Sequence, residues 1–189
     1  MASEAGVAAR AYDQYGDWDR ARDQIRKENP FGIRTASSVT RVSQELVDRL
    51  RTLAPDEIEL VANGSAGERN AISWLAATRR YLLIEEFATE VVRERYVRMM
   101  PTLDASHFDA FLAEKAAWAP EVADLAASTR TRLRQSLFQM LREADLLSQG
   151  GVIEPMFFSD RLLAVLRSQG MDAFQVFPVT DEQIARAMR

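Results

Sequence analysis

The side chains best suited to binding chemistry in this sequence lie between residues 34 and 44. Arg34 precedes an expected helix, and Ser37, Thr40, Arg41 and Gln44 follow at spacings that place all four on one helix face. Guanidinium, hydroxyl and amide groups are the side-chain groups that contact the phosphates and base edges of nucleic acids. The pattern predicts a nucleic-acid contact. Any amphipathic helix has a polar outer face, however, and Ser37 and Thr40 also suit a helix cap.

Five further arginines are expected to contribute weaker phosphate contacts: Arg79, Arg80, Arg130, Arg132 and Arg134. Although the chain has a net charge of −4, residues 69–84 and 125–142 contain arginines and no acidic residue. Together with residues 26–44 they form three locally basic windows, and a basic face on an acidic protein can still attract phosphate. The alternative is that the helices alternate charge for solubility and for internal salt bridges.

Catalytic chemistry is poorly represented. The 189 residues contain no cysteine and one histidine, His107, which excludes a cysteine nucleophile and argues against a Ser-His-Asp triad. Glu86, Glu90 and Glu94 share one helix face, but a di-metal carboxylate site also needs Glu-x-x-His motifs. No phosphate-binding glycine loop or nucleophile elbow occurs. We therefore expect a protein that is not an enzyme, with no catalytic residues, metal, cofactor or small-molecule substrate.

The elements that must position these side chains read as helices throughout. Glycine and proline are scarce, at 8 and 6 residues, and fall at breaks between segments with helical periodicity. About ten helices are predicted, in an all-α bundle. Their expected ranges are approximately 3–14, 17–29, 35–53, 55–63, 65–80, 81–100, 104–118, 159–169 and 180–189. Another helix starts at Pro120, and Ser128 or Thr129 begins or continues a long one that ends at Leu147. Residues 152–158 alone have strand character, and Trp18, Trp74 and Trp118 are expected core anchors.

The helix expected over residues 35–53 carries the most information. Its apolar stripe is Val39, Val42, Leu46, Leu50 and Leu53, so the polar residues named above face outward. A short helix, a tight turn and a helix with exposed Ser, Thr, Arg and Gln are typical of a helix-turn-helix. We expect residues 1–53 to form a helix-turn-helix-like subdomain and residues 54–189 a helical bundle.

Membrane features are also missing from the sequence. The N-terminus has no basic segment followed by an apolar one, so it does not read as a secretory signal. No stretch approaches the length of about 18 apolar residues that a spanning helix needs. We expect a cytoplasmic protein with no membrane partner.

The chain resembles the BrxA family of bacteriophage exclusion (BREX) defence systems over about residues 10–180. The segments that carry the resemblance are, in order, ENPFGIRTASSVTRVSQELVDRL, WLAATRRYLLIEEFATEVVRERY, FDAFLAEKA, STRTRLRQSLFQMLREADLL and SDRLLAVLRSQG. None of them is a catalytic motif. One departure is Asp145, where the family pattern is expected to have a small glycine near a helix end.

The resemblance implies a small, non-enzymatic component of a phage-defence system. The family is likened in fold to the RNA-binding antitermination factor NusB, and members carry helix-turn-helix-like parts proposed to bind DNA. We expect a nucleic-acid-binding accessory protein, with double-stranded DNA as ligand and other BREX components as partners. Two alternatives stay open: a protein-interaction scaffold of the defence complex, and a NusB-like RNA binder.

Overall fold

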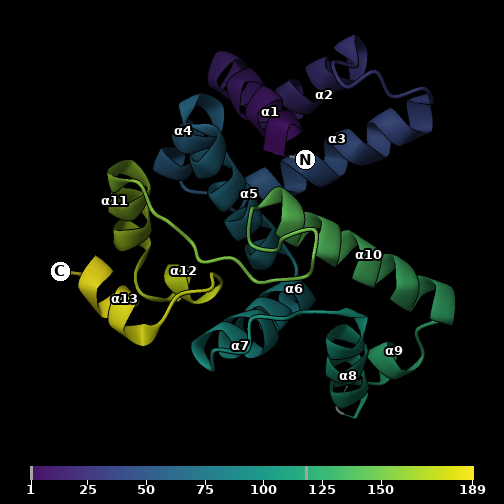
Figure 1. Ribbon diagram of the computed structural model, residues 1–189. Helices are drawn as coiled ribbons and strands as arrows, with labels where there is room; N and C mark the ends of the chain where they lie inside the picture. Colours follow the sequence, from purple (N-terminus) through teal and green to yellow (C-terminus); the bar gives the residue numbers. More distant parts are fainter. Residues whose placement is uncertain (1, 118) are drawn as a thin grey trace. The chain divides into compact units, whose positions relative to one another are not determined.

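The computed structural model describes residues 2–117 and 119–189, and these are mostly helical, with a long connection over residues 144–159 (Figure 1). The all-α prediction is confirmed. The chain divides into two compact units, Met1–Tyr81 and Leu82–Arg189. Among the described residues, extended backbone pairs only at the isolated bridges Thr102–Val152 and Leu147–Ile153, which agrees with a short extended piece after the Gly150-Gly151 break.

The first unit contains five helices: α1 (Ala2–Tyr15), α2 (Trp18–Glu28), α3 (Ala36–Leu50), α4 (Pro55–Asn63) and α5 (Ala66–Arg80). Helix α1 packs on the other four, and α3 packs on α2 and α5. The buried Ala5, Ala8 and Ala9 of α1 allow this close packing. Since α4 and α5 bury their apolar faces against α1 and α3, this unit extends to Tyr81, whereas we expected a division after residue 53.

Helix α3 has the predicted position, but its buried face is rotated from the predicted one. Val39, Leu46 and Leu50 are buried as expected, whereas Val42 is only half-buried. Ser43 is buried in its place because its hydroxyl donates to the carbonyl of Val39 at 2.8 Å. An internally satisfied hydroxyl can therefore occupy a core position.

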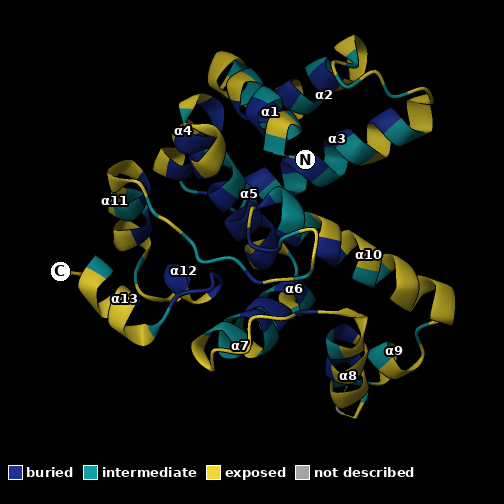
Figure 2. Cartoon of the chain, viewed as in Figure 1, coloured by how far each residue is buried: buried dark blue, intermediate teal, exposed yellow. Residues whose placement is uncertain are grey.

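The second unit begins with a continuous helical run that contains a π-helical turn. Helix α6 (Leu82–Phe87), the π-helical η1 (Ala88–Arg93) and α7 (Glu94–Val97) follow one another without a break. Helices α8 (Ala105–Ala116), α9 (Pro120–Ala123), α10 (Ala127–Glu143), α11 (Asp160–Gln169), α12 (Asp172–Gln175) and α13 (Asp181–Ala187) complete it. The burial pattern in Figure 2 follows the helices, with one side of each longer helix buried.

Two aromatic clusters hold the second unit together. Phe87, on α6, contacts Phe108 and Phe111 of α8 edge to face, with ring centroids 5.7 and 5.2 Å apart. Phe158 contacts Phe174 and Phe177 in the same way, at 5.5 and 5.7 Å. Edge-to-face pairs of this kind add to the stabilisation from burial.

The tryptophans differ from one another in their environment. Trp74 is buried in α5, as expected of a core anchor. Trp18 is half-buried and stacks on Tyr12 with ring centroids 4.1 Å apart. Trp118 lies outside the described residues.

Most helix starts were predicted correctly because the caps are local. The side chains of Ser65, Asp104, Ser159 and Thr180 accept backbone N–H bonds at the starts of α5, α8, α11 and α13. Helix α10 differs, since it begins after Ala126 and ends at Glu143 instead of reaching residue 147.

Asp145 explains the early end of α10. It has a left-handed backbone (φ 59°), and the N–H of Leu146 donates to the carbonyl of Leu141 at 2.9 Å. The N–H of Asp145 itself donates to the backbone carbonyl of Arg142 at 3.1 Å, which completes a Schellman motif. Glycine is the usual residue at this position, and aspartate is one of the few others that adopt it readily.

Candidate nucleic-acid interface

The loop between α2 and α3 presents the first predicted contact, Arg34. Asn29 ends α2 in a left-handed conformation (φ 46°). Its side-chain amide donates to the carbonyl of Ile33 at 2.8 Å, and its oxygen accepts the Ile33 N–H at 3.0 Å. One asparagine thus fixes both the end of the helix and the shape of the loop that follows it. The connection covers residues 29–35, so it is longer than the three- to four-residue turn of a standard helix-turn-helix.

An open pocket of 660 Å³ lies where the end of α2, this loop and the start of α3 meet. We call it the α2–α3 cleft. Its lining includes Arg26, Lys27, Arg34 and Thr40, and its one acidic residue is Asp23. Arg26 forms an ion pair with Asp23 at 3.5 Å, so the cleft retains a net positive charge from Lys27 and Arg34.

Three cations at the cleft and on α3 remain available to a ligand. Lys27, Arg34 and Arg41 are exposed, and none of them forms an ion pair with a described residue. The first backbone N–H groups of α3 point toward the same end of the helix, where they favour an anion. We call Lys27, Arg34, Ser37, Thr40 and Arg41 the α3 face.

The polar side chains of α3 are less free than their types suggest. The Thr40 hydroxyl donates to the carbonyl of Ala36 at 3.0 Å. Gln44 is half-buried, accepts from Arg22 Nη1 at 3.1 Å and donates to Asp48 at 2.8 Å. Both ends of the Gln44 amide are thus bound within the protein, so Gln44 is not positioned to contact a base edge. Ser37 is exposed beside Arg41 on the face predicted for it.

Arg79 lies at the other end of α3 and serves the fold. Its guanidinium binds both oxygens of Glu57, at 2.6 and 2.9 Å, and the carbonyl of Thr52. The Glu57 side chain is 0% exposed and also accepts the N–H of Ala54 at the start of α4. Because the fifteen residues of α3 span about 22 Å, Arg79 is remote from Arg34.

Arg80 belongs to a cluster around Tyr81. The guanidinium groups of Arg80 and Arg49 each lie 5.4 Å from the centre of the Tyr81 ring. The Tyr81 hydroxyl donates to Glu45, and Arg49 donates to the same carboxylate oxygen at 2.8 Å. Burial raises the pKa of Glu45, but the bonds from Tyr81 and Arg49 outweigh it and leave that pKa below its usual value. Burial and the adjacent Glu45 raise the pKa of Tyr81.

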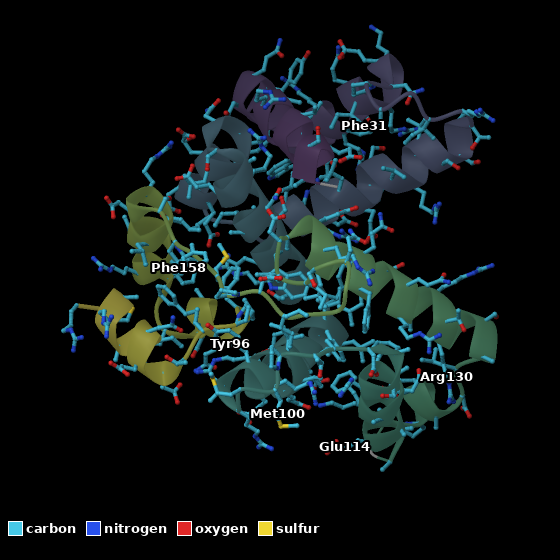
Figure 3. All side chains as sticks on the ribbon, in the orientation of Figure 1. Phe31, Tyr96, Met100, Glu114, Arg130 and Phe158 are labelled. Carbon is cyan, nitrogen blue, oxygen red and sulfur yellow. The ribbon has the colours of Figure 1, made fainter. Side chains whose placement is uncertain are left out.

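The three predicted arginines of α10 have different surroundings. Arg130, labelled in Figure 3 beside α9, donates to the carbonyls of Leu125 and Ala123 and so closes the end of α9. Arg134 binds both oxygens of Asp109 on α8 at 2.9 Å. Arg132 is exposed and has no ion pair with a described residue. Of these three, only Arg132 is free for a ligand.

Within the first unit, the structure therefore brings together Arg34, Ser37, Thr40 and Arg41 around the start of α3, whereas Arg79 and Arg80 lie beyond the end of that helix. Lys27 joins this group although we did not select it from the sequence. Its membership in the basic window 26–44 was the available signal, and its position in the last turn of α2 places it at the loop.

Two further features of the described residues concern membranes and metal ions. No helix there combines the length and apolar character needed to cross a membrane. No group of three or more His, Cys, Asp or Glu side chains in that part of the chain is arranged to hold a metal ion.

Comparisons with known proteins agree on the relationship. The BrxA family model matches residues 1–170. A BREX protein BrxA of Paramagnetospirillum magneticum is 25% identical over 130 residues, which cover 69% of this chain and 65% of that protein. The match thus spans slightly less than two thirds of the relative's length. A crystal structure of an uncharacterized protein from Magnetospirillum magneticum has a TM-score of 0.80 at 21% identity, covering 95% of this chain and 94% of that one, and this likeness concerns the fold.

Proposed function

The chain belongs to the BrxA family of BREX phage-defence components, and on that premise we propose that it binds double-stranded DNA as a cytoplasmic accessory protein without catalysing a reaction. One observation carries the proposal. Lys27, Arg34 and Arg41 are exposed cations without ion pairs to described residues. Lys27 and Arg34 line the cleft at the N-terminal end of α3, and Arg41 lies on that fifteen-residue helix. Phosphate groups are the natural ligands of such a site.

Binding through these residues depends on phosphate more than on base sequence. Arginine and lysine neutralise the backbone, while the Thr40 hydroxyl proton and the Gln44 amide are already bound within the protein. Contacts to phosphate set position and affinity but carry no sequence information directly. The α3 face is therefore expected to hold many DNA sequences with similar affinity.

A salt titration with the purified full-length chain tests the proposal. Anisotropy of a labelled duplex of mixed sequence gives Kd at several salt concentrations. Three phosphate contacts predict that log K falls against log salt with a slope of about −2.7. A flat response, or no binding at low salt, contradicts the proposal. Competition with unlabelled single-stranded and hairpin RNA separates DNA binding from the NusB-like alternative, which predicts that RNA displaces the duplex at a lower concentration.

A protein-interaction role is favoured by a different observation. Met99 and Phe157 in the second unit are 87% and 84% exposed, and exposed apolar side chains mark contact sites for other proteins where they form a contiguous patch. Pull-down from a host that carries the complete defence operon tests this role. Phe157→Ser is expected to lose partners there and to leave duplex binding by the purified chain unchanged.

A further inference from the structure

Helix α10 carries a second polar face that has the composition of a base-reading helix. Arg132, Gln135, Gln139 and Arg142 recur at spacings of 3, 4 and 3 residues, which confines them to one side of the helix. The opposite side buries Leu137 and Leu141, and the buried Phe138 lies at the border, one turn before Arg142. We call these four residues the α10 face.

These side chains are accessible. Arg132, Gln135 and Gln139 are exposed, and Arg142 is half-buried with its guanidinium 5.9 Å from the centre of the Phe138 ring. Gln139 donates one amide N–H to Glu143 at the end of the helix, at 2.8 Å. Its amide oxygen, unlike that of Gln44, accepts no hydrogen bond from a described residue. An open pocket of 840 Å³ lies beside the face, lined in part by Gln135, Gln139 and Arg142.

The other arginines of α10 fix the helix in place. Arg130 binds the end of α9 and Arg134 binds Asp109 of α8. Arg130 lies on the other side of the helix. Arg134 lines the pocket beside the α10 face, but its guanidinium is held by both oxygens of Asp109. The seventeen residues of α10 span about 25 Å, and an α-helix of this kind fits the major groove of B-DNA.

Charge and chemistry favour nucleic acid as the occupant of this face. No acidic residue occurs from Leu125 to Arg142. Two carboxylates, Asp104 and Glu143, border the adjacent pocket, and each accepts a hydrogen bond, from the Ser106 N–H and from Gln139 respectively. Arginine pairs with the O6 and N7 atoms of guanine, and glutamine with the N6 and N7 atoms of adenine.

We propose that the α10 face reads base edges in the major groove of duplex DNA and so gives the chain a sequence preference that phosphate contacts alone do not supply. This inference rests on the proposed function, since a base reader needs DNA to be bound. The two faces belong to different compact units and supply different groups. The α3 face offers cations and hydroxyls to phosphate, whereas the α10 face offers two amides between two guanidinium groups.

Selection from a randomised duplex library tests the inference. The full-length chain is expected to enrich a recurring motif that contains adenine or guanine. Gln135→Ala/Gln139→Ala removes two amides without changing the charge. This variant is expected to lose the enrichment and to bind the enriched duplex about ten-fold more weakly, while its Kd for mixed-sequence duplex and its salt slope stay unchanged.

A matched control and two outcomes complete the test. Gln169→Ala/Gln175→Ala removes two exposed glutamines from α11 and α12 and is expected to keep the motif. Equal melting temperatures show that neither variant is unfolded. Duplex binding without any enriched motif, or a motif that persists in Gln135→Ala/Gln139→Ala, overturns the inference and leaves the proposed function standing. Absence of duplex binding by the unsubstituted chain overturns the proposed function itself.

Discussion

The arginines at the two ends of helix α3 have the same chemistry and opposite surroundings. Arg34, before the helix, is exposed and forms no ion pair with a described residue. Arg79 of α5 lies near Thr52, just after the end of α3. It donates two hydrogen bonds to the fully buried Glu57. Both belong to windows of positive charge in the sequence. The difference teaches that a basic window shows where cations occur, while the partner that each cation finds decides whether it serves the fold or a ligand.

The largest expected effect on stability comes from breaking the ion pair between Arg79 and the buried Glu57. Arg79→Ala leaves the Glu57 carboxylate without its cation, and removing one partner of a buried pair costs about 3 kcal/mol of unfolding free energy. Urea denaturation measures the loss. The double variant Arg79→Met/Glu57→Gln is expected to regain a part of it, because no unpaired buried charge remains. A loss below about 1 kcal/mol in the single variant would show that the pair is equivalent to a surface salt bridge.

The exposed arginines Arg34 and Arg41 predict the reverse: a loss of DNA affinity with little change in stability. Arg34→Ala/Arg41→Ala is expected to leave the unfolding free energy within about 0.5 kcal/mol of the unsubstituted value. Its duplex affinity falls for all sequences alike, and the salt slope becomes less steep by about 1.8 because two phosphate contacts are lost. Anisotropy titrations measure both quantities.

A control of equal charge sharpens that prediction. Arg186→Ala/Arg98→Ala also removes two exposed arginines, whose partners are Glu182 and Glu94 in their own helices. If this control weakens duplex binding as much as Arg34→Ala/Arg41→Ala does, binding follows net charge and not the α3 face.

Helix α10 also carries one arginine with an ion pair, Arg134, and one without, Arg132, and the expected effects of replacing them are smaller. Arg134→Ala breaks a partly exposed pair with Asp109, so we expect a stability loss below about 1 kcal/mol and no change in DNA affinity. Arg132→Ala is expected to leave stability unchanged and to weaken DNA binding. Thermal melting and anisotropy of the two variants side by side measure this separation, and equal effects on binding would remove it.

The smallest effect concerns pH and the cluster around Tyr81. The pKa of Glu45 lies below its ordinary value of 4.5 in the folded chain. Such a carboxylate contributes stability that is present above the ordinary pKa and is lost as pH falls through the lower, folded pKa. Glu45→Gln is therefore expected to flatten the fall in melting temperature on the acid side. The exposed Glu114→Gln serves as the control, and an identical acid profile for Glu45→Gln and the unsubstituted chain would contradict the assignment.

The sequence was sufficient for features that depend on near neighbours. Ser65, Asp104 and Thr180 bond to N–H groups two or three residues away, so their types and positions predict helix starts. The Arg79–Glu57 and Arg134–Asp109 pairs join residues 22 and 25 positions apart. Nothing in the local pattern distinguishes these arginines from Arg34 or Arg132, and only the packing of helices does.

Details inside the helices were also difficult to predict from the sequence. Apolar spacing predicted Val42 in the core, but an internal hydrogen bond allows the polar Ser43 to take that position. The π-helical turn Ala88–Arg93 was also missed, because one wider turn inside a long helix shifts the apolar pattern only slightly. In the candidate site, Ser37 and Arg41 are exposed on α3 as their spacing predicts, whereas the internal bonds of Gln44 depend on Arg22 of the neighbouring helix.

The left-handed residue that ends α10 has a consequence for how this chain can vary. At position 145 the left-handed backbone, with φ at 59°, restricts which amino acids fit. Glycine, asparagine and aspartate satisfy that requirement, while valine, isoleucine and threonine are strained there. In a scan of all single substitutions, this surface position is expected to be as restrictive as a core position, with a preference ordered by backbone freedom instead of by hydrophobicity.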